Sequence, residues 1–145
     1  GRLVGSEMCI RDRTNIGHTS DTDAISIASS GVTTFSAAVV GATDTDTSNT
    51  GSVTLDFAAN QNFVLTFTGN VTLANPSTEA VGQSGIIVCI QDGTGSRTLS
   101  LGTDFETAGG SGITLSTAAS AVDVSPYFVK ASGSIQLGAV QKAFS

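Results

Sequence analysis

Three side chains near the start of the chain have the spacing of a metal-binding loop. Asp44, Asp46 and Ser48 stand at alternate positions, as the first ligands of a calcium-binding loop do. Such a loop has glycine at its sixth position and glutamate at its twelfth, whereas this chain has Asn49 and Leu55 there. Calcium binding is most demanding at those two positions. We therefore interpret the run as a solvated acidic segment and predict no metal site in it.

A histidine and two carboxylates also stand close together in the sequence. They are His18, Asp21 and Asp23, and several serines surround them. A catalytic triad would need a nucleophile and a buried orienting acid held on a rigid scaffold. These residues lie instead in a polar segment with few apolar neighbours. We expect neither catalysis nor metal binding from them.

A glycine-rich loop is the last candidate for chemistry. Gly93, Gly95 and Ser96 have a weak likeness to a phosphate-binding loop. No Lys-Ser or Lys-Thr pair follows, and no helix is predicted to begin there. We expect a tight turn that Arg97 braces through Asp92. The sequence thus predicts no catalytic residue, no metal ligand, no cofactor-binding residue and no enzymatic activity.

Residues 1–13 are expected to be foreign to the natural protein. The sequence Leu3–Arg13, LVGSEMCIRDR, resembles the translation of a transposase-type sequencing adapter. The adapter's final bases encode Met-Cys-Ile-Arg-Asp, as at positions 8–12. We exclude this segment from the expected fold, as for a cloning scar. We expect the natural sequence to begin near Thr14 and to be a metagenomic fragment of a longer protein.

The remaining composition excludes several classes of partner. The first thirteen residues carry three arginines and two acidic residues, so without them the formal charge changes from −6 to −7. The cations that remain are Arg97, Lys130 and Lys142. Nucleic-acid grooves and contacts with anionic membranes both need clustered Lys or Arg. No apolar run approaches the roughly 20 residues of a membrane helix. We expect no nucleic-acid binding and no membrane insertion.

The segment that organises the expected fold is the apolar run Ile86–Ile90. Because it is apolar at every position, it predicts a central strand covered on both faces. Cys89 lies within it and is predicted to be a small, buried and unreactive side chain, with no other thiol left to form a disulfide. Asp92-Gly93 then predicts a hairpin turn into a strand at Thr98–Leu101.

Alternating apolar residues predict the other strands. Residues 53–57, 63–67 and 71–73 indicate a three-stranded meander, with a turn at Thr68–Asn70. Further strands are expected at residues 113–115, 122–131 and 134–139. We therefore predict an all-β fold, an antiparallel β-sandwich or jelly roll, over residues 51–145.

Residues 14–50 are predicted to form a fibre-like lead-in and a linker. Two short strands, around Ile25–Ile27 and Val32–Thr34, have too few apolar groups to form a core of their own. We expect them to pair with the same strands in other copies of the chain. Residues 42–50, with the sequence ATDTDTSNT, are polar and small, and we interpret them as the linker.

A set of short motifs then follows in a fixed order. They are LDF at Leu55, NF at Asn62, LTFTGNVTLANPS from Leu65, GQSG from Gly82, QDGTGSRTLSLG from Gln91, LSTAAS from Leu115, DVSPYFV from Asp123 and LGAVQKAF from Leu137. Together they resemble a β-domain at the C-terminal end of fibre-like virion proteins of tailed phages, over residues 51–145. The lead-in is similar to the repetitive segments that precede such domains. Relatives often carry Trp after the Arg-Thr strand, where this chain has Leu99 and Leu101.

The resemblance implies a virion structural protein, most simply the distal domain of a homotrimeric tail fibre. It implies other virion proteins as partners, contact with a host-surface receptor, and a place in the extracellular particle. The chain has no Trp, one Tyr and seven Phe, most of them at positions predicted to face inward, so we expect polar loops to make any host contact. Two alternatives stay open: a head-decoration or fibre-stalk module without a receptor, and a bacterial surface adhesin repeat.

Overall fold

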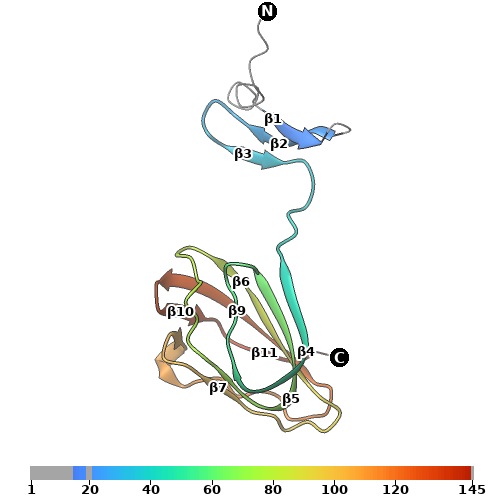
Figure 1. Cartoon of the computed structure of the whole chain (residues 1–145), viewed down its shortest axis with the longest axis vertical. Coiled ribbons are helices and arrows are strands. Elements are labelled where there is room, and N and C mark those ends of the chain that lie inside the picture. The colour runs from blue at the N-terminus through green and yellow to red at the C-terminus, as the bar shows by residue number, and fades with distance from the viewer. Residues whose placement is uncertain (1–14, 19–20, 145) are drawn as a thin grey trace, which may run out of the picture. The chain divides into compact units, whose positions relative to one another are not determined.

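The chain forms two units, residues 1–40 and residues 41–145, in a computed structural model that describes residues 15–18 and 21–144. Unit 1 is an antiparallel sheet of β1 (Asn15–His18), β2 (Asp21–Ile27) and β3 (Thr33–Phe35) (Figure 1). None of the side chains described between residues 24 and 40 is buried. The adapter-like segment Leu3–Arg13 lies outside the described residues.

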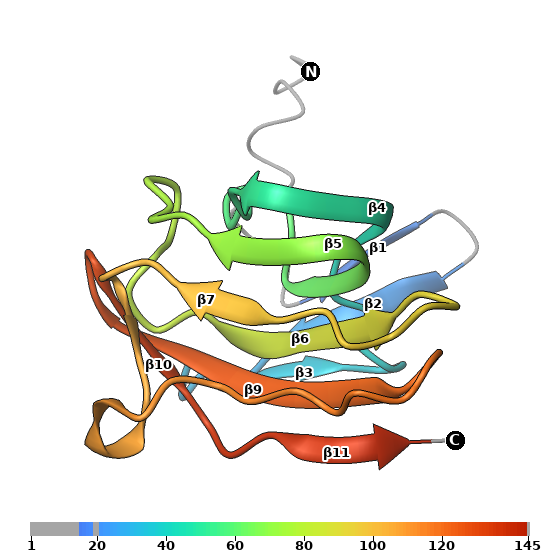
Figure 2. The same cartoon turned by 90° about the horizontal axis from the view of Figure 1, so that it is seen from below.

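Unit 2 is a single eight-stranded sheet that curls around the core (Figures 1 and 2). Its strands are β4 (Thr43–Val53), β5 (Asn62–Leu73), β6 (Ser84–Gln91), β7 (Leu99–Leu101), β8 (Phe105–Glu106), β9 (Val122–Ala131), β10 (Ser134–Leu137) and β11 (Gln141–Phe144). The order is β4-β5-β6-β9-β10-β8, with β7 paired to β5 and β11 paired to β9. The only helical turn in the described part of the chain is a 3₁₀ turn at Ala108–Gly110. The all-β prediction is confirmed.

The sheet of unit 2 contains parallel as well as antiparallel pairs of strands, whereas the sequence predicted an antiparallel arrangement. β5 pairs in parallel with β4, β6 and β7, whereas β9 pairs antiparallel with β6, β10 and β11. Alternation of apolar residues has the same period in both kinds of pairing, so it carries no information on strand direction. The result is a mixed sheet with its core on one side.

The predicted turn at Thr68–Asn70 is wrong, because β5 runs through it without a break. Buried side chains at Phe67 and Val71 lie on either side of Gly69 and keep the same alternation. A Cβ atom at Gly69 would overlap the hydroxyl group of Thr50 on β4. The glycine therefore allows a close approach between strands and does not mark a turn.

The predicted hairpin at Asp92-Gly93 is also wrong. β7 does not pair with β6, and Leu99 instead pairs with Val71 on β5. The buried side chain of Gln91 explains the difference: its Nε2 donates to the carbonyl of Arg97 at 2.9 Å, and its Oε1 accepts from the Arg97 amide at 2.8 Å. A side-chain amide thus takes the place of the backbone partner that a hairpin would supply.

The predicted linker at residues 42–50 is a strand. β4 pairs with β5 from Thr43 opposite Asn62 to Val53 opposite Leu73, so unit 2 begins at Gly41 and not at Gly51. The segment is polar because β4 is an edge strand, where charged side chains discourage pairing with other sheets.

In the second half of unit 2, two of the three predicted strands are present in whole or in part. The strand at Val122–Ala131 is confirmed at both ends, and the strand from Ser134 ends at Leu137. Residues 113–115 form no strand, although Leu115 is buried in the core.

The core lies on the concave side of the sheet. The buried apolar side chains that form one cluster there are Leu55, Phe57, Phe63, Leu65, Phe67, Val71, Leu73, Ile87, Cys89, Leu99, Phe105, Leu115, Tyr127, Val129, Ile135 and Leu137. Phe57 lies edge-on to both Phe63 and Tyr127, with ring centroids 5.0 Å and 5.2 Å apart. The Tyr127 hydroxyl donates to the carbonyl of Gln61 at 2.7 Å. No helix in the described part of the chain is long and apolar enough to cross a membrane.

Candidate functional site: a groove over β8, β9 and β10

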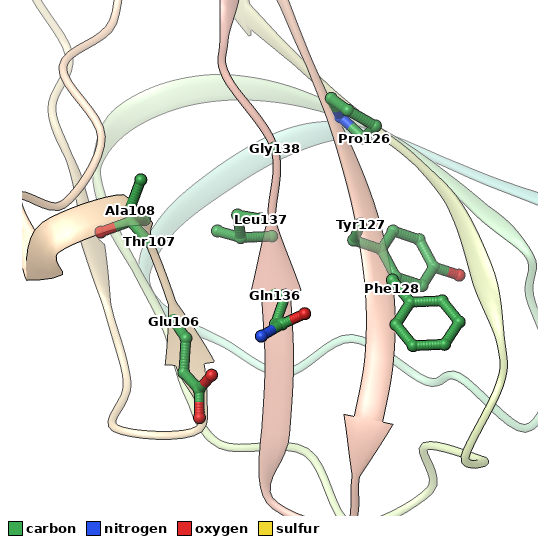
Figure 3. Close-up of a pocket in the computed structure, with 9 residues that line it drawn as sticks. All are labelled: Glu106, Thr107, Ala108, Pro126, Tyr127, Phe128, Gln136, Leu137 and Gly138. Carbon is green, nitrogen blue, oxygen red and sulfur yellow. The ribbon is translucent and has the colours of Figure 1, made fainter.

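An open groove of about 510 Å³ crosses three neighbouring strands of unit 2. Its walls come from β8 with the turn after it, from β9 and from β10 (Figure 3). The side chains that give it chemical character are Glu106, Phe128 and Gln136. We call this feature the β8–β10 groove.

Strand register places these three side chains in one row. Gln136 on β10 pairs with Phe128 on β9 and, on its other side, with Glu106 on β8. On β9 the neighbours of Phe128, Tyr127 and Val129, are buried, so Phe128 faces outward and remains 46% exposed. An aromatic ring, an amide and a carboxylate therefore lie side by side across the sheet.

The carboxylate of Glu106 is held in a fixed position. Its Oε1 accepts from the Ser134 hydroxyl at 2.7 Å, and its Oε2 lies 3.0 Å from the Lys130 ammonium. Hydrogen bonds from Ser134 and then Lys130 lower the pKa of Glu106 below its ordinary value. The groove thus presents an ionised acceptor at neutral pH, together with the donors and acceptors of the Gln136 amide.

This set of groups is suited to recognition. An exposed aromatic ring covers apolar ligand surface at low cost in entropy, while fixed polar neighbours set orientation. The arrangement favours the binding of a polyhydroxylated ligand such as a saccharide.

The groove did not figure in the sequence prediction. Alternation gave no signal for Phe128, because it shares its parity with Val122 and Val124, whereas the structure buries the other parity, which contains Asp123. Glu106 and Gln136 gave no signal either. They meet through pairing of β8 with β10, which no local pattern reveals.

The acidic residues with the spacing of a calcium-binding loop lie outside the β8–β10 groove. Asp44 and Asp46 are on β4, where Asp46 Oδ1 accepts from the Ser48 amide at 3.0 Å and Asn49 is buried. In the part of the chain that the structure describes, no three His, Cys, Asp or Glu residues gather in a way that could hold a metal ion.

His18 and Asp21 are register partners at the ends of β1 and β2. The side chains of His18, Asp21 and Asp23 lie outside the described part of the structure, which gives only their backbone. The interpretation of this trio stays a prediction.

The glycine-rich loop after β6 is braced as predicted, although it is not a hairpin. Arg97 donates from its terminal nitrogen to Asp92 Oδ2 at 2.8 Å. The Asp92 carboxylate also accepts from the amides of Thr94 and Gly95. The hydrogen bond from Arg97 and those from the loop lower the pKa of Asp92 to about 2. The Asp92 carboxylate therefore holds the loop in place through these hydrogen bonds.

Comparison with known proteins places the chain in a family. A family model with the description "Putative phage tail fibre C-terminal domain" matches residues 42–134, which is more than half of the chain. The chain belongs to this family. The match begins one residue before β4, so the tail fibre domain includes the segment we had taken for a linker. No curated protein and no solved structure matches the chain.

Cys89 of the tail fibre domain is expected to be inert. It is 5% exposed, and burial, with a smaller contribution from Asp123, raises the pKa of its thiol to about 12. Since the thiolate is the reactive form, the native protein should not react with a thiol reagent at pH 8 over an hour. The measurement needs a Cys9→Ser background, with full reaction in denaturant as its control. Labelling of the native protein at the rate of a free thiol would contradict the assignment.

Proposed function

We propose that this tail fibre domain attaches the phage to the host surface and that the β8–β10 groove holds a surface saccharide. The observation that carries the proposal is the row of Phe128, Gln136 and Glu106, with the aromatic ring nearly half exposed. The proposed role is that of a non-catalytic binding module in the virion. The family match favours a tail fibre over a head-decoration module or a bacterial adhesin repeat.

We also propose that the fibre is a homotrimer. Unit 1 leaves large apolar side chains in water, with Val32 61% exposed, Phe35 49% and Val39 70%. A three-stranded sheet without a buried face is not stable by itself in water. Packing against the same strands of other copies would bury these side chains and cover the open edges of the sheet.

Phe128→Ala tests the saccharide site. We expect the wild-type protein to bind at least one member of an array of purified bacterial surface polysaccharides. Truncation of a hot-spot aromatic residue costs about 2 kcal/mol or more, so Phe128→Ala should weaken that binding by roughly 30-fold if its ring is the central contact. Thermal unfolding of the variant should stay close to that of the wild type, because the ring lies on the outer surface.

Phe144→Ala is the matched control, since Phe144 is 48% exposed on β11 and does not line the groove. It should leave polysaccharide binding unchanged. An equal loss in both variants would place the contact elsewhere. A wild-type protein that binds no polysaccharide on the array would favour the stalk module without a receptor.

A further inference from the structure

The sheet of unit 2 has an apolar outer face as well as a buried inner one. On its outer side, β5, β6 and β9 carry side chains that we call the outer apolar face: Val64, Ile86, Val88, Ile90, Val122 and Val124. Their strands lie side by side in Figure 2. Register joins Val64 to Val88 and Val88 to Val124, and the next row joins Ile90 to Val122. Ile86 is 43% exposed, and the other five are partly exposed.

The other half of β5 shows what a water-facing surface of this sheet looks like. There Thr72 pairs with Ser52 on β4 and with Ser100 on β7, and all three side chains are exposed. This strand thus carries hydroxyl groups outward along its second half, whereas Val64 lies outward in its first half, between Asn62 and Thr66. A sheet face in contact with water normally alternates apolar-in with polar-out. The outer apolar face has instead the composition of a buried layer.

The chemistry of this face fits a second copy of the chain. None of its six side chains is charged, in a chain of formal net charge −6, so here two copies can meet without bringing carboxylates together. At about 3.3 Å per residue and 4.8 Å per strand, the face and its flanking strands measure about 25 Å by 20 Å. That is about 500 Å² before the relief of side chains, less than the roughly 800 Å² of accessible surface that each partner buries in a standard interface, so this face would supply part of an interface.

We infer that the outer apolar face packs against the same face of other copies of this chain. In a homotrimer three such faces meet around the threefold axis, and the fibre would then enclose a second apolar layer. The inference rests on the proposed homotrimer and assigns part of its interface to unit 2. It also explains why the run Ile86–Ile90 is apolar at every position: Ile87 and Cys89 face the core of their own chain, and the alternate residues face another copy.

Val88→Glu in the full chain tests the inference, because Val88 lies at the centre of the face. Sedimentation velocity at micromolar concentration should show an assembled wild type and a monomeric variant, with the association weakened by at least 100-fold. Val88→Thr keeps the shape of the side chain and should weaken association by about tenfold without disturbing the strand. Thr72→Glu is the matched control, with the same charge on an exposed position of the same sheet, and should assemble as the wild type does.

The outcomes separate this inference from the proposal beneath it. An assembled wild type with an equally assembled Val88→Glu variant would overturn the outer apolar face as the interface and leave the homotrimer to unit 1. A monomeric wild type would overturn both. Weakening by Val88→Glu and Thr72→Glu alike would indicate a general effect of charge and would also overturn the inference.

Discussion

Phe63→Ala is expected to lower the free energy of unfolding by about 3–5 kcal/mol, the range for loss of a large buried aromatic side chain. Phe63 is 0% exposed, and its strand β5 is paired on both sides. Its ring lies 5.0 Å from that of Phe57 and 6.3 Å from that of Tyr127, measured between centroids. The cavity left by alanine would open in the middle of this aromatic group, where β4, β5 and β9 cannot collapse without breaking their pairing.

The measurement is urea denaturation followed by circular dichroism at one fixed protein concentration, since self-association adds to apparent stability. Phe144→Ala removes the same atoms from a side chain that is 48% exposed and serves as the control. It should change the free energy of unfolding by less than about 1 kcal/mol. Equal effects of the two substitutions would contradict the position of the core.

Asp123→Asn is expected to destabilise unit 2 by roughly 3 kcal/mol, because hydrogen bonds to a charged group contribute about 1.5–3 kcal/mol each. Asp123 is 2% exposed, and its carboxylate accepts from the Ser116 amide at 2.6 Å, from the Ser116 hydroxyl at 2.8 Å and from the Ala143 amide at 2.9 Å. Asparagine offers one acceptor and turns its own N–H groups toward these donors. Asp123 thus joins the loop before β9 to the last strand, β11.

The effect of Asp123→Asn should depend on pH. Burial raises the pKa of Asp123, but the hydrogen bonds from Ser116 and Ala143, together with the charge of Lys142, outweigh it, so the pKa is lowered overall. A carboxyl group with a lowered pKa stabilises the fold above the unfolded-state pKa of about 3.9, and this stability is lost as pH falls through the folded-state pKa. Melting temperatures of wild type and variant should therefore differ most at pH 6–7 and converge below about pH 4. A difference that stays constant from pH 7 to pH 3 would contradict this role.

Local patterns predicted the strands and their inward faces better than the way the strands pair. Alternation identified Phe63, Leu65 and Phe67 as inward, and it gave the full extent of Val122–Ala131. Strand direction could not be predicted, because parallel and antiparallel strands share one period. β4 was missed because a polar edge strand has the composition of a linker.

The site was less predictable than the strands. The outward position of Phe128 could not be predicted, because its strand has apolar residues on both faces and buries the face that contains Asp123 and Ser125. Its meeting with Glu106 depends on two pairings, β9 with β10 and β10 with β8, between segments that are distant in sequence. The redirection of β7 depends on the buried amide of Gln91, which closes the loop at Arg97. Contacts of this kind are properties of the folded chain and have no counterpart in composition or spacing.

The parallel pairing of β4 with β5 also has a mechanical consequence. In a C-terminal domain, a pulling force from the rest of the fibre enters at the N-terminal end, which here is the start of β4 at Thr43. A pull along the strand axis loads the hydrogen bonds between β4 and β5 in shear, so many must break together and none can be peeled off alone. Rupture under force is governed by the unfolding rate, and shear geometry raises the barrier for that step. Under the proposed role in host attachment, the edge strand β4 would carry the load between the fibre and a bound surface.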